Sequence, residues 1–150
     1  MSNALAPYYP WILLLHLACA IVFVGAVTFE VFVLEGLHRS IDIATMGRIE
    51  TAVMARVRKF MPVVVLLLFL SGFALFDLRC NGLQCIGSTR FGWFLLAKVV
   101  LAFGVLGVFL NAIIAGVRGR MNACRFRYTH RIVLTMMVAI VFLAKAMFYL

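Results

Sequence analysis

Residues 11–34 have the sequence WILLLHLACAIVFVGAVTFEVFVL, in which a single glutamate carries the only full charge. Three further apolar runs follow, at residues 60–76, 91–117 and 132–150. Each run is close to the roughly 20 residues that a helix needs to cross about 30 Å of hydrocarbon. Membrane-spanning strands would be about half as long and would alternate between polar and apolar residues, and these runs show no such alternation. The sequence therefore predicts an all-α integral membrane four-helix bundle, built from one transmembrane domain over residues 1–150.

The composition indicates a lipid-exposed protein. Hydrophobic residues make up 66% of the chain and charged residues 13%, whereas a soluble domain is about half apolar and about a quarter charged. The interior of a 150-residue chain is too small to hide so much apolar surface from water. The net charge of +9 does not indicate nucleic-acid binding, because most basic residues lie in two short loops. The lipid bilayer is the expected partner, and nucleic acid is not.

The basic loops predict the orientation. Loops 38–59 and 118–131 lie on the same side of a four-span protein, and basic loops face the cytoplasm. We therefore expect a multi-pass protein of a bacterial inner membrane, with both termini on the periplasmic side. The first run is not a typical cleavable signal, because it is long and no basic segment precedes it. The basic residues of the two loops are Arg39, Arg48, Arg56, Arg58, Lys59, Arg118, Arg120, Arg125, Arg127 and Arg131.

Part of the first basic loop is expected to be helical. Apolar residues recur at helical spacing over residues 46–59, between charged ones. This segment either extends the second span or lies in the membrane interface. Pro62 then either kinks the second span or marks its first turn.

Two of the four cysteines are expected to pair. Cys80 and Cys85 lie in the predicted periplasmic loop, where a disulfide is favoured over free thiols or soft metal ligands. Cys124 lies in a cytoplasmic loop and is expected to be reduced. Cys19 lies in the first span and is interpreted as a small packing residue.

Ionisable side chains inside the spans are the candidates for function, because each costs at least about 2.5 kcal/mol at the bilayer centre. Counted from the outer helix ends at about 1.5 Å per residue, His16, Lys98 and Lys145 lie at nearly one depth. One interpretation is a buried polar pocket that binds a cofactor or substrate. The other is that both lysines snorkel to the outer headgroups and His16 hydrogen-bonds a neighbouring helix.

His38 and His130 form a second candidate layer, near the cytoplasmic helix ends. They are either two axial ligands of one haem on facing helices or interfacial histidines among arginines. With His16, they are the candidate ligands of haem iron.

One face of the first span is expected to point into the bundle. His16, Phe23 and Glu30 recur every seven residues and share this face with the small residues Cys19 and Ala20. Glu30 is expected to form an ion pair with Arg56, Arg58 or Lys59, or else to relay protons.

Small residues on the other spans are expected to allow close helix packing. Gly104, Gly107 and Asn111 form such a face on the third span, with Asn111 bonding across helices. Ser71 and Gly72 are expected to do the same on the second.

Short motifs along the chain are similar to those of a known family. Residues 11–17 (WILLLHL), followed by residues 23–25 (FVG) and by His38, resemble the first helix of the CopD/HemJ-like superfamily of small membrane proteins. Residues 58–62 (RKFMP) leading to residues 70–72 (LSG) resemble the second helix of its CopD-like members.

The later helices extend the resemblance. Residues 93–98 (WFLLAK) resemble the third helix, and residues 127–128 with Lys145 resemble the fourth helix of HemJ-like members. The resemblance implies a four- or five-helix inner-membrane bundle. HemJ-like members are haem-b-binding protoporphyrinogen oxidases, and their histidine and lysine correspond to His16 and Lys98. CopD-like members imply copper resistance or uptake.

Three functions are open. The favoured one is a b-type haem protein with one or two haems, which transfers electrons to or from a quinone, a porphyrinogen or an oxygen species near the outer face. His16 would bind haem, while Lys98 and Lys145 would pair with propionates or an anionic substrate. The alternatives are a copper-binding or transport protein and a non-catalytic accessory subunit. A homodimer or a larger membrane complex is compatible with each.

Sequence motifs of soluble enzymes are not recognised. The chain has no evident Ser-His-Asp set, phosphate-binding glycine loop or zinc signature. Whether the protein is an enzyme is therefore open, with a haem-dependent membrane oxidoreductase as the candidate.

Overall fold

The computed structural model describes residues 2–80, 90–120 and 123–149, and the described chain is helical without strands. The short N-terminal elements are α1 (Ser2–Leu5) and the 3-10 turn η1 (Ala6–Tyr8), followed by α2 (Tyr9–Phe29). The π-helical segment η2 (Glu30–Leu34) and α3 (Glu35–Leu37) continue α2. The long helices are then α4 (Ile43–Cys80), α5 (Arg90–Val117) and α6 (Ala123–Tyr149).

Four of these helical stretches are long and apolar enough to cross a membrane: Ala6–Leu37, Ile43–Cys80, Arg90–Val117 and Cys124–Ala146. Large apolar side chains remain exposed along them, among them Ile21, Leu66, Val100 and Phe142. Such surface is stable in contact with lipid rather than with water. The predicted all-α fold is confirmed, and its four long apolar helices are compatible with the predicted multi-pass membrane protein.

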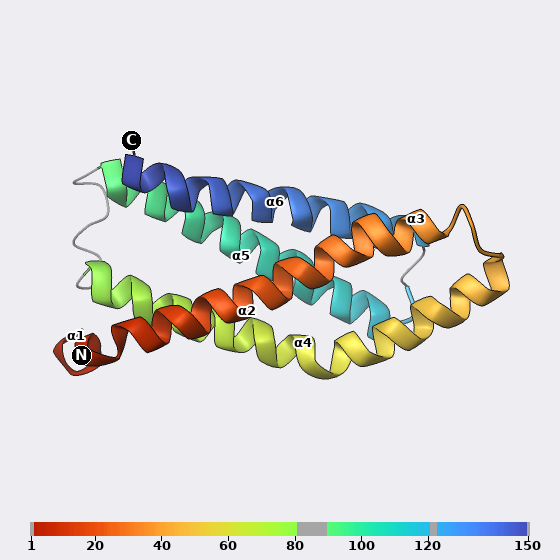
Figure 1. The fold of residues 1–150 in the computed structure, drawn as a ribbon, viewed down its shortest axis with the longest axis horizontal. Helices are drawn as coiled ribbons and strands as arrows, with labels where there is room; N and C mark the ends of the chain where they lie inside the picture. Colours follow the sequence, from red (N-terminus) through yellow and green to blue (C-terminus); the bar gives the residue numbers. More distant parts are fainter. Residues whose placement is uncertain (1, 81–89, 121–122, 150) are drawn as a thin grey trace. The chain divides into compact units, whose positions relative to one another are not determined.

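The chain divides into two compact units, Met1–Gly82 and Leu83–Leu150. In the first unit α2 packs on α4, and in the second α5 packs on α6 (Figure 1). Each unit is thus a pair of helices that run in opposite directions.

Side chains at both ends of the first unit fix the antiparallel arrangement. Arg79, near the end of α4, donates to the Tyr9 hydroxyl at the start of α2, with an Nη2···Oη distance of 2.6 Å. The guanidinium carbon also lies 5.3 Å from the centre of the Tyr9 ring. At the other end, His38 contacts Glu50 of α4.

Helix α4 is longer than the span expected at residues 60–76. It has 38 residues, about 57 Å at 1.5 Å per residue, against about 30 Å of hydrocarbon. The basic segment 46–59 is therefore an extension of the second span, which was one of the two predicted placements. Pro62 lies inside the helix rather than at its first turn.

Asp42 caps the start of α4. Its carboxylate accepts a hydrogen bond from the Thr45 N–H, with an Oδ2···N distance of 2.9 Å. This contact satisfies one of the amides that a helix start leaves without an intrahelical partner. The same hydrogen bond lowers the pKa of Asp42 below its ordinary value, because it stabilises the ionised form.

Gly119 ends α5. Its φ of +66° is left-handed, and the amides of Gly119 and Arg120 donate to the carbonyls of Gly116 and Ala115. This pair of hydrogen bonds is a Schellman motif, which requires a residue that tolerates positive φ.

Candidate functional site

His16 lies half-buried on α2, against α4 of the same unit. Its Nδ1 lies 3.1 Å from the Leu68 carbonyl oxygen and 3.1 Å from the Ser71 hydroxyl. A carbonyl can only accept, so the contact with Leu68 requires that Nδ1 carry the proton. In the neutral ring the lone pair is then on Nε2. This is the tautomer that metal-binding histidines adopt when a backbone carbonyl holds their other nitrogen.

Ser71 supports this arrangement through its hydroxyl group. It is buried, and its hydroxyl lies 2.7 Å from the Leu67 carbonyl and 3.1 Å from the Leu68 carbonyl. The hydroxyl can therefore donate within α4 while its lone pair accepts from His16. The close-packing role expected of Ser71 is thus accompanied by a hydrogen bond to the candidate ligand.

Gly72 provides the space for the His16 ring. A Cβ at this position would lie 3.2 Å from Cε1 and 3.6 Å from Nδ1 of His16. The first distance is tighter than ordinary van der Waals contact, so a larger residue would displace the ring. The expected close packing at Gly72 is confirmed, and the packed group is the imidazole itself.

The face of α2 that carries His16 is buried as predicted. Cys19, Phe23, Val27 and Glu30 each have less than a tenth of their surface exposed. Glu30 is the first residue of the π-helical segment η2 and has an interaction partner. The pattern of seven predicted this face, but no feature of the sequence indicated the π-helical turn.

Glu30 also lines an apolar groove of about 460 Å³ between α2–η2 and α4. Phe29 of α2 lines one side of the groove, and Val57 and Phe60 of α4 line the other side. Arg56, one of the predicted partners of Glu30, lines the same groove. The structure therefore places Glu30 and Arg56 in the lining of one groove. The sequence predicted that the two residues are near each other, but it did not predict a groove.

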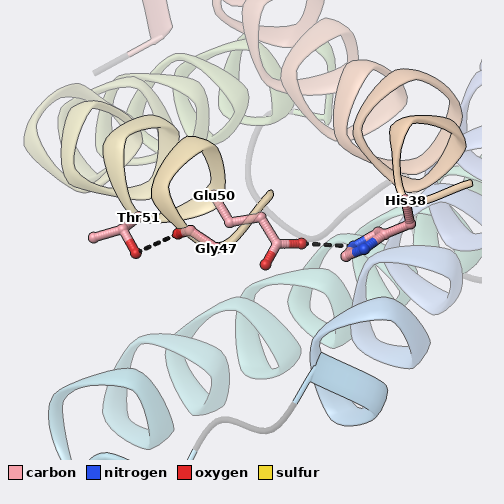
Figure 2. A network of polar contacts seen from close by, with 4 residues as sticks. All are labelled: His38, Gly47, Glu50 and Thr51. Carbon is pink, nitrogen blue, oxygen red and sulfur yellow. Dashed lines mark hydrogen bonds and ion pairs between the residues drawn. The ribbon is translucent and has the colours of Figure 1, made fainter. Parts of the chain in front are cut away.

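His38 follows α3 and is engaged by Glu50, as Figure 2 shows. The Nε2···Oε1 distance is 2.8 Å, and about a third of each side chain is exposed. The Thr51 hydroxyl donates to the Gly47 carbonyl one turn away on α4. One nitrogen of His38 is thus already used in a contact that links α3 to α4, which gives this histidine a structural role.

His130 lies half-buried on α6, in the second unit. Its Nδ1 donates to the Phe126 carbonyl at 2.8 Å, and the two rings have centroids 4.1 Å apart. This hydrogen bond lies within α6, whereas the contact between His16 and Leu68 joins two helices. The pairing of His38 with His130 on one haem stays a prediction.

Two contacts set the register of the second unit. The Phe91 and Phe148 rings lie 6.4 Å apart, and a Cβ at Gly104 would lie 2.5 Å from the Met136 methyl. Between these contacts, Lys98 on α5 is level with about residue 142 of α6 at 1.5 Å per residue. Lys145 lies three residues further along α6, about 4.5 Å beyond that level, so the two lysines are separated by nearly one helical turn along this helix pair.

The lysines differ in exposure. Lys98 is half-buried, and Lys145 is exposed, with its Nζ 4.9 Å from the centre of the Tyr149 ring. The face of an aromatic ring attracts a lysine ammonium electrostatically, so Tyr149 is a partner of Lys145 within α6. The common level of His16 with both lysines stays a prediction.

The packing face expected on α5 is only partly present. Gly104 is closely approached by Met136, whereas a Cβ at Gly107 would meet nothing within 4 Å. Asn111 is exposed. Within this unit, Gly104 therefore has the predicted packing role and Gly107 does not.

Cys80 is buried at the end of α4 and is disulfide-bonded. Cys85, its predicted partner, lies outside the described residues, so the pairing stays a prediction. Cys19 is buried and Cys124 exposed, and both are free thiols. Within the described residues, no group of three or more His, Cys, Asp or Glu side chains could hold a metal ion.

Comparisons with known proteins give no assignment. No protein-family model matches the chain, and no curated protein or solved structure matches it.

Proposed function

We propose that the protein is a membrane-embedded b-type haem protein with His16 as an axial ligand. The contact between His16 Nδ1 and the Leu68 carbonyl carries the proposal. It orients the ring and leaves the lone pair on Nε2, the arrangement by which proteins tune and hold a metal-binding imidazole.

Basic residues supply the counterpart for an anionic cofactor. Lys98 and Lys145 lie within about one helical turn of each other in the second unit, and we propose that they pair with haem propionates or an anionic substrate. The lipid-exposed apolar helices would exclude water from the site. Haem, when bound, supplies one-electron chemistry with a quinone, a porphyrinogen or an oxygen species. The similarity to HemJ-like sequences at residues 11–17 and 93–98 agrees with this assignment.

The proposal is limited to one haem. His38 already uses Nε2 in its contact with Glu50, and breaking that contact would be required for ligation through this nitrogen. One haem per chain is therefore the expected stoichiometry.

The membrane and its orientation are part of the proposal. The basic extension of α4 is proposed to face the cytoplasm of a bacterial inner membrane, with both termini in the periplasm. Ile43 is 93% exposed, so Ile43→Cys in a Cys124→Ser background should react with an impermeant maleimide in inverted vesicles. Labelling in intact spheroplasts instead would show that the protein has the opposite orientation.

The test of haem binding is a reduced-minus-oxidised visible spectrum with pyridine-haemochrome quantitation per chain. The wild type should contain one haem b, and His16→Ala should lose it. His130→Ala is the matched control, since its Nδ1 also donates to a backbone carbonyl, and it should keep the haem. A colourless protein after haem-replete expression contradicts the proposal, and copper analysis would then test the alternative metal.

A further inference from the structure

The groove between α2–η2 and α4 has the size of a ligand site. Its volume is about 460 Å³, and sites for small molecules commonly have about 300–1,000 Å³. Phe29, Val57 and Phe60 make its surface apolar, and the polar residues in its lining are Glu30 and Arg56. An apolar chain with one charged end would match this lining.

The two charged residues of the groove differ in availability. Glu30 is 6% exposed and already takes part in an interaction. Arg56 is exposed, and it forms no hydrogen bond or ion pair with another residue of the described ranges. The groove therefore offers a ligand a positive charge rather than a negative one, which favours an anionic headgroup.

The surroundings strengthen this charge preference. Residues 43–59 of α4 contain four basic residues and one acidic residue, Glu50, and all four basic side chains are exposed. Arg56 lies four residues, or about 6 Å, before the apolar run that begins at Phe60. This is the level at which lipid headgroups meet a membrane protein, and basic pockets at that level bind acidic lipids.

We infer that this groove binds one acidic phospholipid, with an acyl chain against Phe29, Val57 and Phe60 and its phosphate on Arg56. The inference is independent of haem binding, because none of the groove residues contacts His16, Ser71 or Gly72 in the contacts described above. It requires only that the chain lie in a bilayer.

Native mass spectrometry of the full chain, with dioleoyl phosphatidylglycerol against dioleoyl phosphatidylcholine, tests the headgroup. One phosphatidylglycerol should be retained preferentially. Arg56→Gln should lower its affinity roughly fivefold, the effect expected of one basic residue at a membrane surface. Arg48→Gln, an exposed arginine of the same helix outside the groove, should leave it nearly unchanged. Equal retention of the two lipids, or equal losses in the two variants, would overturn the inference.

A second pair of variants tests the acyl chain. Ala52 lines the groove and Ala55 does not, although both are exposed on α4. Ala52→Phe should fill the groove and lower phosphatidylglycerol retention, while Ala55→Phe should not. Glycerol 3-phosphate should fail to displace the lipid, because it has no chain to bury. Complete displacement by glycerol 3-phosphate would show an anion site only and would contradict the lipid assignment.

Discussion

A Cβ on Gly72 would lie 3.2 Å from Cε1 of His16, so glycine at position 72 sets how closely the candidate haem ligand approaches α4. The imidazole is rigid and is held by the Leu68 carbonyl, and it has little freedom to move aside. The first prediction follows from this contact.

Gly72→Ala should displace the His16 ring by a few tenths of an ångström and weaken its hydrogen bond to Leu68. We expect a shifted haem spectrum or reduced haem content, with the helix itself retained, since alanine favours helix over glycine. Gly104→Ala is the control, because its new Cβ would meet only the flexible methyl of Met136. Visible spectra and haem quantitation on both variants provide the measurement, and identical spectra for both variants would contradict the role of Gly72.

The contact between His38 and Glu50 should contribute little to stability, despite its length of 2.8 Å. Both side chains are about one-third exposed, and exposed pairs typically contribute about 0.2–1 kcal/mol. A double-mutant cycle with His38→Ala and Glu50→Ala, followed by reversible unfolding in detergent, should give a coupling energy in this range. A coupling above about 2 kcal/mol would indicate a pair shielded from solvent.

The start of α4 should weaken in acid. The hydrogen bond from Thr45 lowers the pKa of Asp42 in the folded protein. The stabilisation of the folded protein by ionised Asp42 is therefore fully present above the unfolded pKa of about 3.9. That contribution is lost as pH falls through the lower folded value. Thermal unfolding between pH 2 and 6 should show a smaller acid loss for Asp42→Asn, which keeps a cap that does not titrate. Asp42→Ala should be less stable than wild type at pH 6.

Gly119→Ala should destabilise the second unit by about 1 kcal/mol. The φ of +66° at this position places an alanine Cβ close to the following carbonyl. Gly107→Ala is a suitable comparison, because that position is helical, open to a Cβ, and exposed. It should be neutral or slightly stabilising. Chemical unfolding in detergent would measure both, and equal stabilities would contradict the requirement for a left-handed residue.

The four spans could be predicted from the sequence because hydrophobic length is a local property. The run at residues 11–34 needs no knowledge of its neighbours to be recognised as a spanning helix. The length of α4 was harder to predict, because residues 46–59 combine helical spacing with many charges. Whether such a segment continues a span depends on the helix start, and Asp42 provides that start only once its carboxylate meets Thr45.

The sequence was sufficient to predict which residue is the candidate ligand, but not which residues contact it. His16 was recognisable because an ionisable group in an apolar run is costly. Its contacts with Leu68, Ser71 and Gly72 depend on the register of α2 against α4, because these residues lie more than 50 positions from His16 in the sequence. The groove at Glu30 likewise depends on two helices and on a π-helical turn that has no clear sequence pattern.

Pro62 lies at the midpoint of α4, with 19 residues of the helix before it and 18 after it. It cannot donate a backbone hydrogen bond to the Arg58 carbonyl, so the helix is least stiff at this position. A change in the direction of α4 therefore meets the least resistance at Pro62. A swing of about 10° there would move Ile43 by roughly 5 Å, at 1.5 Å per residue. A small bend at Pro62 would therefore correspond to a larger displacement at the far end of the helix.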